Sequence, residues 1–382
     1  MGNSLEAFTG VVEQPIVNEP VKDKETERGH MIATNKRGER RPVTFAVSSM
    51  QGWRATMEDT HILEPSLKLK EDLPDHAFFG VFDGHGGYFT SQYVSENFTR
   101  ILTKRREWKN YISMSASARA EVPGIQLVRD ALTNAFIDMD TELEKIYVDQ
   151  LSQIDLRTNK RQSKTNLHSS PVDSRDERNT QETAKPVIEK LLLDRSGTTA
   201  VSVLLTPTHI ICSNAGDSRA ILCRDGMALP LSFDHKPVNP TEISRVNAAG
   251  GFVKMKRIDG DLAVSRGFGD FRYKLNGNAS VHKQKVIAVP EIIVFPRNDA
   301  KDEFLILGCD GIWDVVDNAA CAELVKSKLK EGKNDLGQIC EEMLDECLGR
   351  DSKDNMTILM VALPGCKMSD NPSSKSLFSS LM

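Results

Sequence analysis

The sequence predicts an α+β layered domain, with antiparallel β-strands inside and helices outside. Three apolar runs at 199–205, 209–214 and 219–224 are joined through short links that contain Thr-Pro-Thr and Gly-Asp-Ser. Connections this short force antiparallel pairing, because parallel strands need a long crossover. The segment 125–147 instead carries apolar residues at spacings of three and four, which indicates one face of a helix.

The same patterns place the remaining elements. Further strands are expected at 43–48, 61–63, 77–82, 286–289, 292–295, 304–307 and 357–361, and further helices at 240–249, 318–329 and 336–348. The polar residues 1–42 are expected to form a flexible N-terminal arm, residues 43–364 a folded domain, and the Ser-rich residues 365–382 a flexible tail.

An insertion is expected at 152–185, between the long helix and the strand at 199. Only five of its 34 residues are aliphatic and none is aromatic. Such a segment buries too little apolar surface to offset its ordering entropy, so it is predicted to be disordered. A solvated loop explains this composition, and docking of a substrate is the alternative.

Composition excludes several classes of protein. The net charge of −5 gives no basic field of the kind that nucleic-acid-binding proteins use, so no nucleic-acid partner is expected. No apolar run is long enough for a transmembrane segment, and the N-terminus does not resemble a secretory signal. The seven cysteines lack CxxC spacing, which favours reduced core residues over disulfides or a catalytic thiol.

The reduced cysteines favour a protein of the cytoplasm, the nucleus or both, and a monomer is expected. Gly2 follows Met1, but Glu6 stands where the myristoylation pattern has Ser or Thr, so the pattern is incomplete. Acylation at Gly2 would place the protein peripherally on a membrane.

Acidic residues recur where the predicted strands begin or end. They are Glu58, Asp59, Asp83, Asp310, Asp314 and Asp354. Each alone could cap a turn, but a carboxylate beside a hydrophobic strand is costly to bury without a partner. Because few basic residues lie in these motifs, cations explain the set better. Oxygen ligands favour Mg²⁺ or Mn²⁺, and the lack of Cys/His pairs argues against zinc.

Nine motifs make a specific resemblance. In chain order they are SSMQGWRATMEDTH, FFGVFDGHGG, RSGTTAVSVLL, SNAGDSRAIL, DHKPVNPTEISRVNAAGG, LAVSRGFGDF, VPEI, LGCDGIWDVV and DNMTIL. Together, over roughly 43–363, they resemble the metal-dependent protein phosphatases, the type 2C serine/threonine family. The resemblance implies two packed antiparallel β-sheets flanked by helices, an α-β-β-α sandwich. It also implies hydrolysis of phosphoserine and phosphothreonine on protein substrates.

The resemblance further implies a role for each motif residue. Two Mg²⁺ or Mn²⁺ ions would be bridged by Asp83. Asp310 and Asp354 would complete one site, and Glu58 with the carbonyl of Gly84 the other. Asp217 and Asp314 match positions associated with a third, weaker ion.

Three further residues would handle substrate and water. Arg54 would bind the phosphate, His85 would protonate the leaving oxygen, and Asp59 would orient water. From the residues alone, other interpretations stay open. Arg54 could be a structural ion-pair partner. His85 could have the structural role of holding its tight turn, and Asp217 could cap a turn. A pseudoenzyme scaffold and another two-metal hydrolase, such as a nuclease, are the competing functions.

Overall fold

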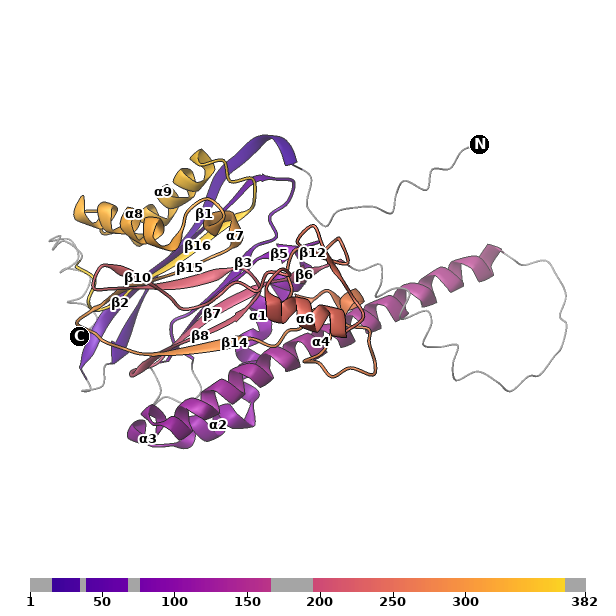
Figure 1. Ribbon diagram of the computed structural model, residues 1–382, viewed down its shortest axis with the longest axis horizontal. Coiled ribbons are helices and arrows are strands. Elements are labelled where there is room, and N and C mark those ends of the chain that lie inside the picture. The colour runs from indigo at the N-terminus through magenta and orange to yellow at the C-terminus, as the bar shows by residue number, and fades with distance from the viewer. Residues whose placement is uncertain (1–15, 35–38, 68–75, 166–194, 368–382) are drawn as a thin grey trace.

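The computed structural model describes residues 16–34, 39–67, 76–165 and 195–367. Two antiparallel sheets pack face to face, and helices cover both outer faces (Figure 1). This is the α-β-β-α sandwich that the sequence predicts. Within the described ranges, no helix is both long and apolar enough to span a membrane.

The first sheet has six strands in the order β1-β2-β16-β15-β9-β10. Their bounds are Ile16–Thr34 (β1), Arg40–Arg54 (β2), Met356–Ala362 (β16), Asp302–Gly308 (β15), Arg219–Arg224 (β9) and Met227–Pro230 (β10). The second sheet has the order β14-β8-β7-β4-β3. Its strands are Glu291–Pro296 (β14), His209–Ala215 (β8), Ala200–Leu205 (β7), Ala77–Phe82 (β4) and Thr60–Glu64 (β3).

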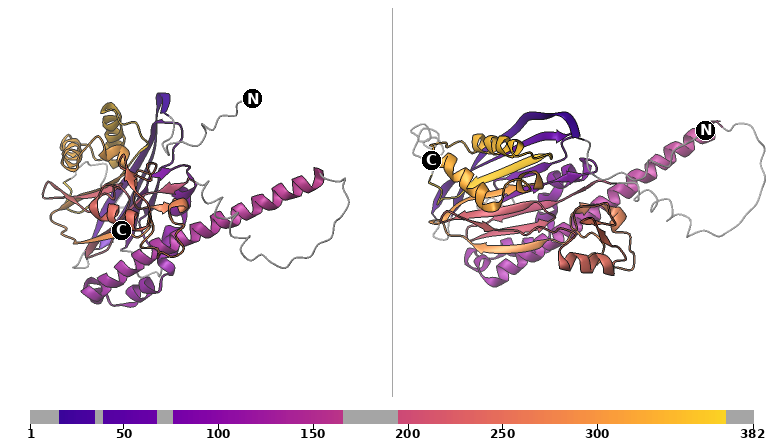
Figure 2. Two further views of the ribbon diagram at one scale, coloured as in Figure 1. Left: turned by 45° about the vertical axis from the view of Figure 1, so that its right-hand side comes forward. Right: turned by 45° about the horizontal axis from the view of Figure 1, so that its top comes forward.

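Helices form the outer layers (Figures 1 and 2). The first sheet is covered by α8 (Asn318–Lys330) and α9 (Leu336–Gly349), with the single turn α7 (Asp310–Trp313) between sheet and helices. The second sheet is covered by α1 (Phe89–Lys104) and α4 (Val122–Thr165), against which α2 (Arg106–Ser113) and α3 (Ala116–Ala120) pack.

Strand β4 shows why the sheets stack. All six of its residues are buried, because the strand has a covered face on each side. Phe79 points into the core between the sheets, where its ring lies 5.2 Å from that of Phe45 on β2. The neighbouring Phe78 points the other way and stacks on Phe98 of α1 at 5.4 Å.

The expected flexible arm is wrong for residues 16–34, which form the edge strand β1 along β2. Its sequence carries little apolar signal because most of its side chains are exposed. The strand is held by backbone pairing and by ion pairs to α9. Arg28 pairs with Asp335 and Glu341, and Lys24 pairs with Asp345.

The expected insertion is also wrong at its beginning, because residues 152–165 continue α4 as helix. This end of α4 extends beyond the rest of the folded body in every view (Figures 1 and 2). The packed part of the helix matches the predicted stripe at 125–147. Residues 166–194 and 368–382, and with them most of the expected insertion and tail, lie outside the described residues, as does Gly2.

Most of the other predicted strands and helices are confirmed, and one strand is wrong. The remaining strands and the three shorter helices are confirmed, with α6 at Pro240–Ala248. The strand expected at 286–289 is wrong, because only Ile287 makes a bridge, to Arg266. The helices α1, α2 and α3 were not predicted.

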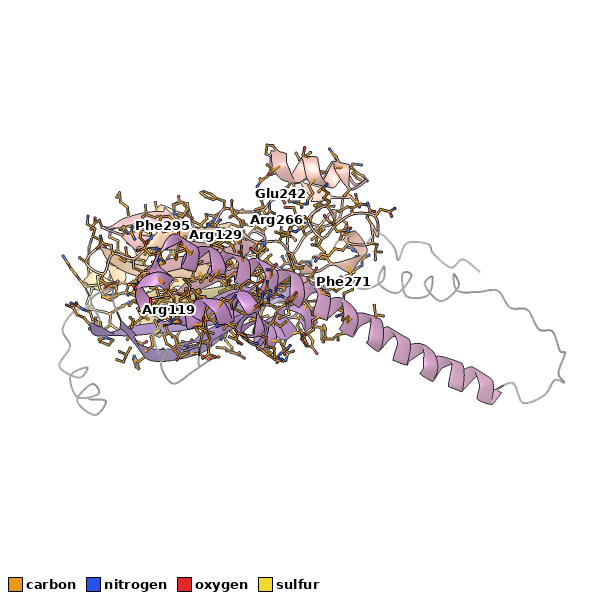
Figure 3. All side chains as sticks on the ribbon, turned by 90° about the horizontal axis from the view of Figure 1, so that it is seen from below. Arg119, Arg129, Glu242, Arg266, Phe271 and Phe295 are labelled. Carbon is orange, nitrogen blue, oxygen red and sulfur yellow. The ribbon has the colours of Figure 1, made fainter. Side chains whose placement is uncertain are left out.

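A small subdomain follows β10 and carries α6 and the hairpin β11–β12 (Val253–Lys254 and Arg257–Ile258). It has its own apolar cluster around Val246 and Ile258. Glu242 of α6 accepts hydrogen bonds from Arg245 and Arg266, which ties the helix to the loop before β13 (Phe268–Gly269). Figure 3 shows Glu242 and Arg266 next to each other in this subdomain.

Candidate metal centre

The acidic motif residues meet because the strands that carry them end at one edge of the sandwich. Asp83 follows β4, Asp310 follows β15, and Asp354 lies two residues before β16. Glu58 lies in the loop from β2 to β3. These side chains line one open cavity of about 620 Å³, together with Arg54, Gly84, His85, Asp217 and Asp314. Nine of the ten predicted site residues therefore line one cavity.

Asp59 is the tenth, and it lies directly behind the cavity wall. It is 7% exposed, and its Oδ2 accepts a hydrogen bond of 2.8 Å from Thr357 Oγ1 on β16. One side-chain atom each of Asp59, Asp83 and Cys309 lie within 4.8 Å of one another. Burial raises the pKa of the Cys309 thiol well above its ordinary value, so the thiol is protonated in the metal-free protein. It accepts a hydrogen bond from the backbone N–H of Thr357.

The position of Gly84, next to Asp83, has no room for a side chain. It belongs to the short strand β5 (Gly84–His85), which pairs with β6 (Gly197–Thr198). A Cβ at Gly84 would lie 2.3 Å from the carbonyl oxygen of Glu58 and 2.8 Å from Ser91 Oγ. The absent side chain therefore lets the backbone carrying Asp83 approach the loop carrying Glu58.

The charges of the centre repel one another. Burial, followed by the nearby charge of Asp310, raises the pKa of Asp83 well above its usual range. Burial and the charges of Asp217 and Asp354 do the same to the pKa of Asp310. So many neighbouring carboxylates can all stay ionised only if cations compensate them.

Several buried oxygens of the centre also lack a partner. Oε2 of Glu58, Oδ1 of Asp59 and Oδ1 of Asp217 make no hydrogen bond within the described residues. Buried polar atoms are rarely left unpaired, so these oxygens are available to a ligand or to ordered water. An all-oxygen donor set with unpaired, mutually repelling carboxylates fits hard divalent cations such as Mg²⁺ and Mn²⁺.

Arg54, at the end of β2, lies at the rim of this centre. Its Nη2 donates to Asp354 Oδ2 at 2.6 Å, and its Nε donates to the carbonyl of Lys353 at 3.2 Å. The ion pair that the sequence left open as an alternative therefore exists. It does not exclude phosphate binding, because the guanidinium has further N–H donors.

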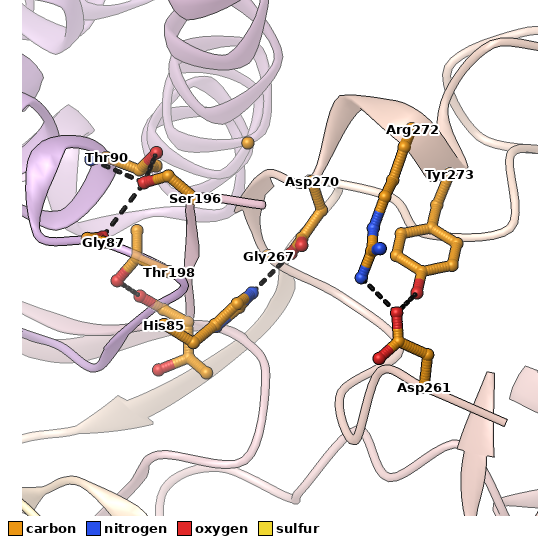
Figure 4. Close-up of polar contacts among 12 residues, drawn as sticks. His85, Gly87, Thr90, Ser196, Thr198, Asp261, Gly267, Asp270, Arg272 and Tyr273 are labelled. Atoms are coloured by element: carbon orange, nitrogen blue, oxygen red, sulfur yellow. Dashed lines mark hydrogen bonds and ion pairs between the residues drawn. The ribbon is translucent and has the colours of Figure 1, made fainter. Parts of the chain in front are cut away.

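His85 has a buried partner that sequence reasoning missed. Its Nε2 lies 2.8 Å from Oδ2 of Asp270, which is fully buried just after β13 (Figure 4). Burial lowers the pKa of His85, but the charge and hydrogen bond of Asp270 outweigh it, so the pKa is raised. Asp270 adopts a left-handed φ of 52°, which non-glycine residues rarely do. The signal in the sequence was its place in LAVSRGFGDF.

A second missed residue is Lys236, from the motif DHKP. It lines the same cavity, and its Nζ donates to Asp217 Oδ2 at 2.7 Å. Asp217 itself lies in the turn between β8 and β9 and is buried.

Comparison with known proteins agrees with this geometry. The family model described as protein phosphatase 2C matches residues 43–146 and 140–356. Protein phosphatase 1A of Bos taurus is 34% identical over 338 residues, which is 88% of this chain and 75% of that protein. The chain belongs to the protein phosphatase 2C family. It is therefore a protein serine/threonine phosphatase, and metal dependence is a general property of this family.

Another relative and one solved structure are also similar to this chain. Protein phosphatase 2C homolog 2 of Saccharomyces cerevisiae is 35% identical over 356 residues, covering 91% of this chain but only 62% of the yeast protein. The crystal structure of serine-threonine phosphatase 2C from Toxoplasma gondii has the same fold. It has a TM-score of 0.64, 23% identity, and covers 89% of this chain and 99% of that one.

Proposed function

We propose that this phosphatase hydrolyses phosphoserine and phosphothreonine on proteins at a centre of two Mg²⁺ or Mn²⁺ ions. The observation that carries the proposal is the convergence of carboxylates from five separate motifs on one cavity, without enough positive charge to balance them. Asp83 would bridge the two ions. Asp310 and Asp354 would complete one site, and Glu58 with the carbonyl of Gly84 the other.

When bound, such a pair of cations supplies a water of lowered pKa as nucleophile and offsets charge on the phosphoryl oxygens. Asp59 would orient water by its unpaired Oδ1, because its other oxygen is fixed by Thr357. The role of the remaining side chains is to hold the phosphate and to protonate the leaving group.

Arg54 is suited to the phosphate because its guanidinium is permanently charged and can bind two oxygens at once. The contact with Asp354 anchors one side of the guanidinium, so the remaining donors are presented at the cavity rim. His85 is suited to protonate the serine or threonine oxygen, whose high pKa makes it a poor leaving group. Asp270 would hold the ring in place from behind.

Two other functions remain as alternatives. A phosphatase-like scaffold without activity would tolerate loss of ligands, but every predicted ligand is present in the cavity or directly beside it. Another two-metal hydrolase, such as a nuclease, would suit a more basic surface than a net charge of −5 provides.

The experiment is a phosphopeptide assay on the purified chain with EDTA and after addition of Mn²⁺ or Mg²⁺. The chelated protein should be inactive, and either ion should restore release of phosphate from phosphoserine and phosphothreonine peptides. Full turnover in EDTA would exclude the metal-dependent mechanism. Metal binding without turnover would support the scaffold instead.

A further inference from the structure

Lys236 places a positive charge among carboxylates of the metal centre. Its segment follows β10, whereas its partner Asp217 lies in the turn between β8 and β9. The 2.7 Å bond between Nζ and Asp217 Oδ2 is a charge-assisted hydrogen bond, the stronger class of such bonds. Asp217 is 3% exposed, so this bond meets little competition from solvent.

The same ammonium also faces the other acidic residues on this side of the cavity. Burial lowers the pKa of Lys236, but the charge and hydrogen bond of Asp217, together with the charges of Asp310 and Asp314, raise it above the ordinary value. Burial raises the pKa of Asp314, and among the basic residues Lys236 lowers that pKa the most. Lys236 thus supplies one positive charge where Asp217 and Asp314 could hold a cation.

Asp217 keeps one oxygen for such a cation. Its Oδ1 is buried and has no hydrogen-bond partner in the described ranges of the chain, although Oδ2 is bonded to Lys236. The lysine is not locked in place, because 34% of its side chain is exposed and its stem is flexible. It can therefore leave toward solvent without disturbing the fold around Asp217.

We propose that the ammonium of Lys236 occupies the position of a third divalent cation at Asp217 and Asp314 and competes with it. This inference rests on the proposed two-metal function, in which the first two ions are held by other residues. A third ion that takes both oxygens of Asp217 must break the Lys236–Asp217 bond, and one that takes only Oδ1 is repelled by the nearby ammonium. Lys236 would thereby make the third site weak and keep it empty unless the cation concentration is high.

The test is direct binding of Mn²⁺, measured by calorimetry and by the electron paramagnetic resonance signal of free Mn²⁺. Wild type should bind two ions and a third much more weakly. In Lys236→Met, which removes the charge but keeps the stem, the third affinity should rise roughly 10- to 100-fold. Lys236→Arg keeps the charge and should retain the weak third site.

Lys256→Met is the matched control. Lys256 lines the same cavity from the turn between β11 and β12, and its replacement makes the same change in net charge. It should leave all three affinities unchanged. The inference would be overturned if Lys236→Met bound two ions normally and the third no more tightly than wild type. A wild type that bound no Mn²⁺ would instead overturn the proposed function, and this inference with it.

Discussion

Asp83 and Asp310 are the residues at which function and stability conflict. Both have a raised pKa because burial and neighbouring carboxylates disfavour their ionised forms. A raised pKa in the folded state means that ionisation destabilises the fold, and that destabilisation is present at neutral pH without a cation. Without a cation, these carboxyls lower the stability of the fold at neutral pH, and a bound cation stabilises it.

Replacing Asp310 by Asn should therefore have opposite effects on stability and turnover. Without metal, Asp310→Asn should raise the melting temperature by about 1–3 °C, because one of the repelling charges is gone. With Mn²⁺, it should lose both the stabilisation by metal and the phosphatase activity. Melting curves with EDTA and with Mn²⁺ measure the first effect, and a phosphopeptide assay the second. Near wild-type activity would show that Asp310 is not a ligand.

His85 and Arg54 should be separable by the choice of substrate. His85→Gln should lower kcat on a phosphoserine peptide by about 10²–10⁴-fold, because the leaving oxygen then lacks a proton donor. The effect on p-nitrophenyl phosphate should be far smaller, because its leaving group needs no proton. Arg54→Ala should instead raise KM for both substrates through lost phosphate binding. An equal loss of kcat on both substrates in His85→Gln would show that the histidine is not the proton donor.

At the scale of elements, β1 illustrates how context decides structure. It lies at the edge of the first sheet, and only a few of its side chains, such as Ala33, reach the core. Its many charged residues suit an exposed edge, where they also discourage pairing with another chain. The strand is therefore specified by the partner strand β2 and by α9 rather than by its own pattern.

Deleting residues 1–34 should consequently destabilise the protein. The deletion exposes the edge of β2 and removes the packing of Ala33, so the melting temperature should fall by roughly 5–10 °C and aggregation should increase. Arg28→Met, which removes only the exposed ion pairs to α9, should cost less than about 1 kcal/mol. Melting and light scattering of both variants would test this. An unchanged melting temperature for the deletion would mean that β1 is dispensable.

The elements also show what a single sequence can reveal. Strands such as β4 and β7 were predictable because both of their faces are covered and their residues are uniformly apolar. The polar strand β1 was not, since its pairing depends on residues far away in sequence. The segment 286–289 has the apolar pattern of a strand, but its buried residues, such as Val286, pack in the small apolar cluster of the subdomain instead.

The same limit applies to the metal centre. Its carboxylates could be predicted because each follows or precedes a recognisable strand within a distinctive motif. Asp270 and Lys236 could not be assigned roles, because their importance arises from contacts with His85 and Asp217 across the fold. Pairings of this kind depend on tertiary structure, which a single sequence does not display.

At the scale of the whole molecule, two groups of buried titrating residues act on stability in opposite directions. The carboxylates of the centre have raised pKa values, so acid relieves their repulsion. His76, which directly precedes β4 and packs against α2, behaves in the opposite way. Burial lowers its pKa to about 3, and its Nε2 lies 3.0 Å from the hydroxyl of the buried Tyr111. These two contributions to the acid response of the fold oppose each other.

The contribution of His76 can be isolated with His76→Gln, whose amide can still bond to Tyr111 but does not titrate. Because the folded pKa of about 3 lies below the unfolded value of 6.5, the neutral histidine stabilises the fold fully above pH 6.5. That stabilisation is lost progressively as the pH falls from 6.5 toward 3. Between pH 7.5 and 5.0, wild type should therefore lose about 2 kcal/mol more unfolding free energy than His76→Gln. Urea unfolding of both proteins in EDTA at the two pH values measures the difference, and the shared carboxylates cancel from it. Parallel losses in the two proteins would show that His76 is protonated in the folded state.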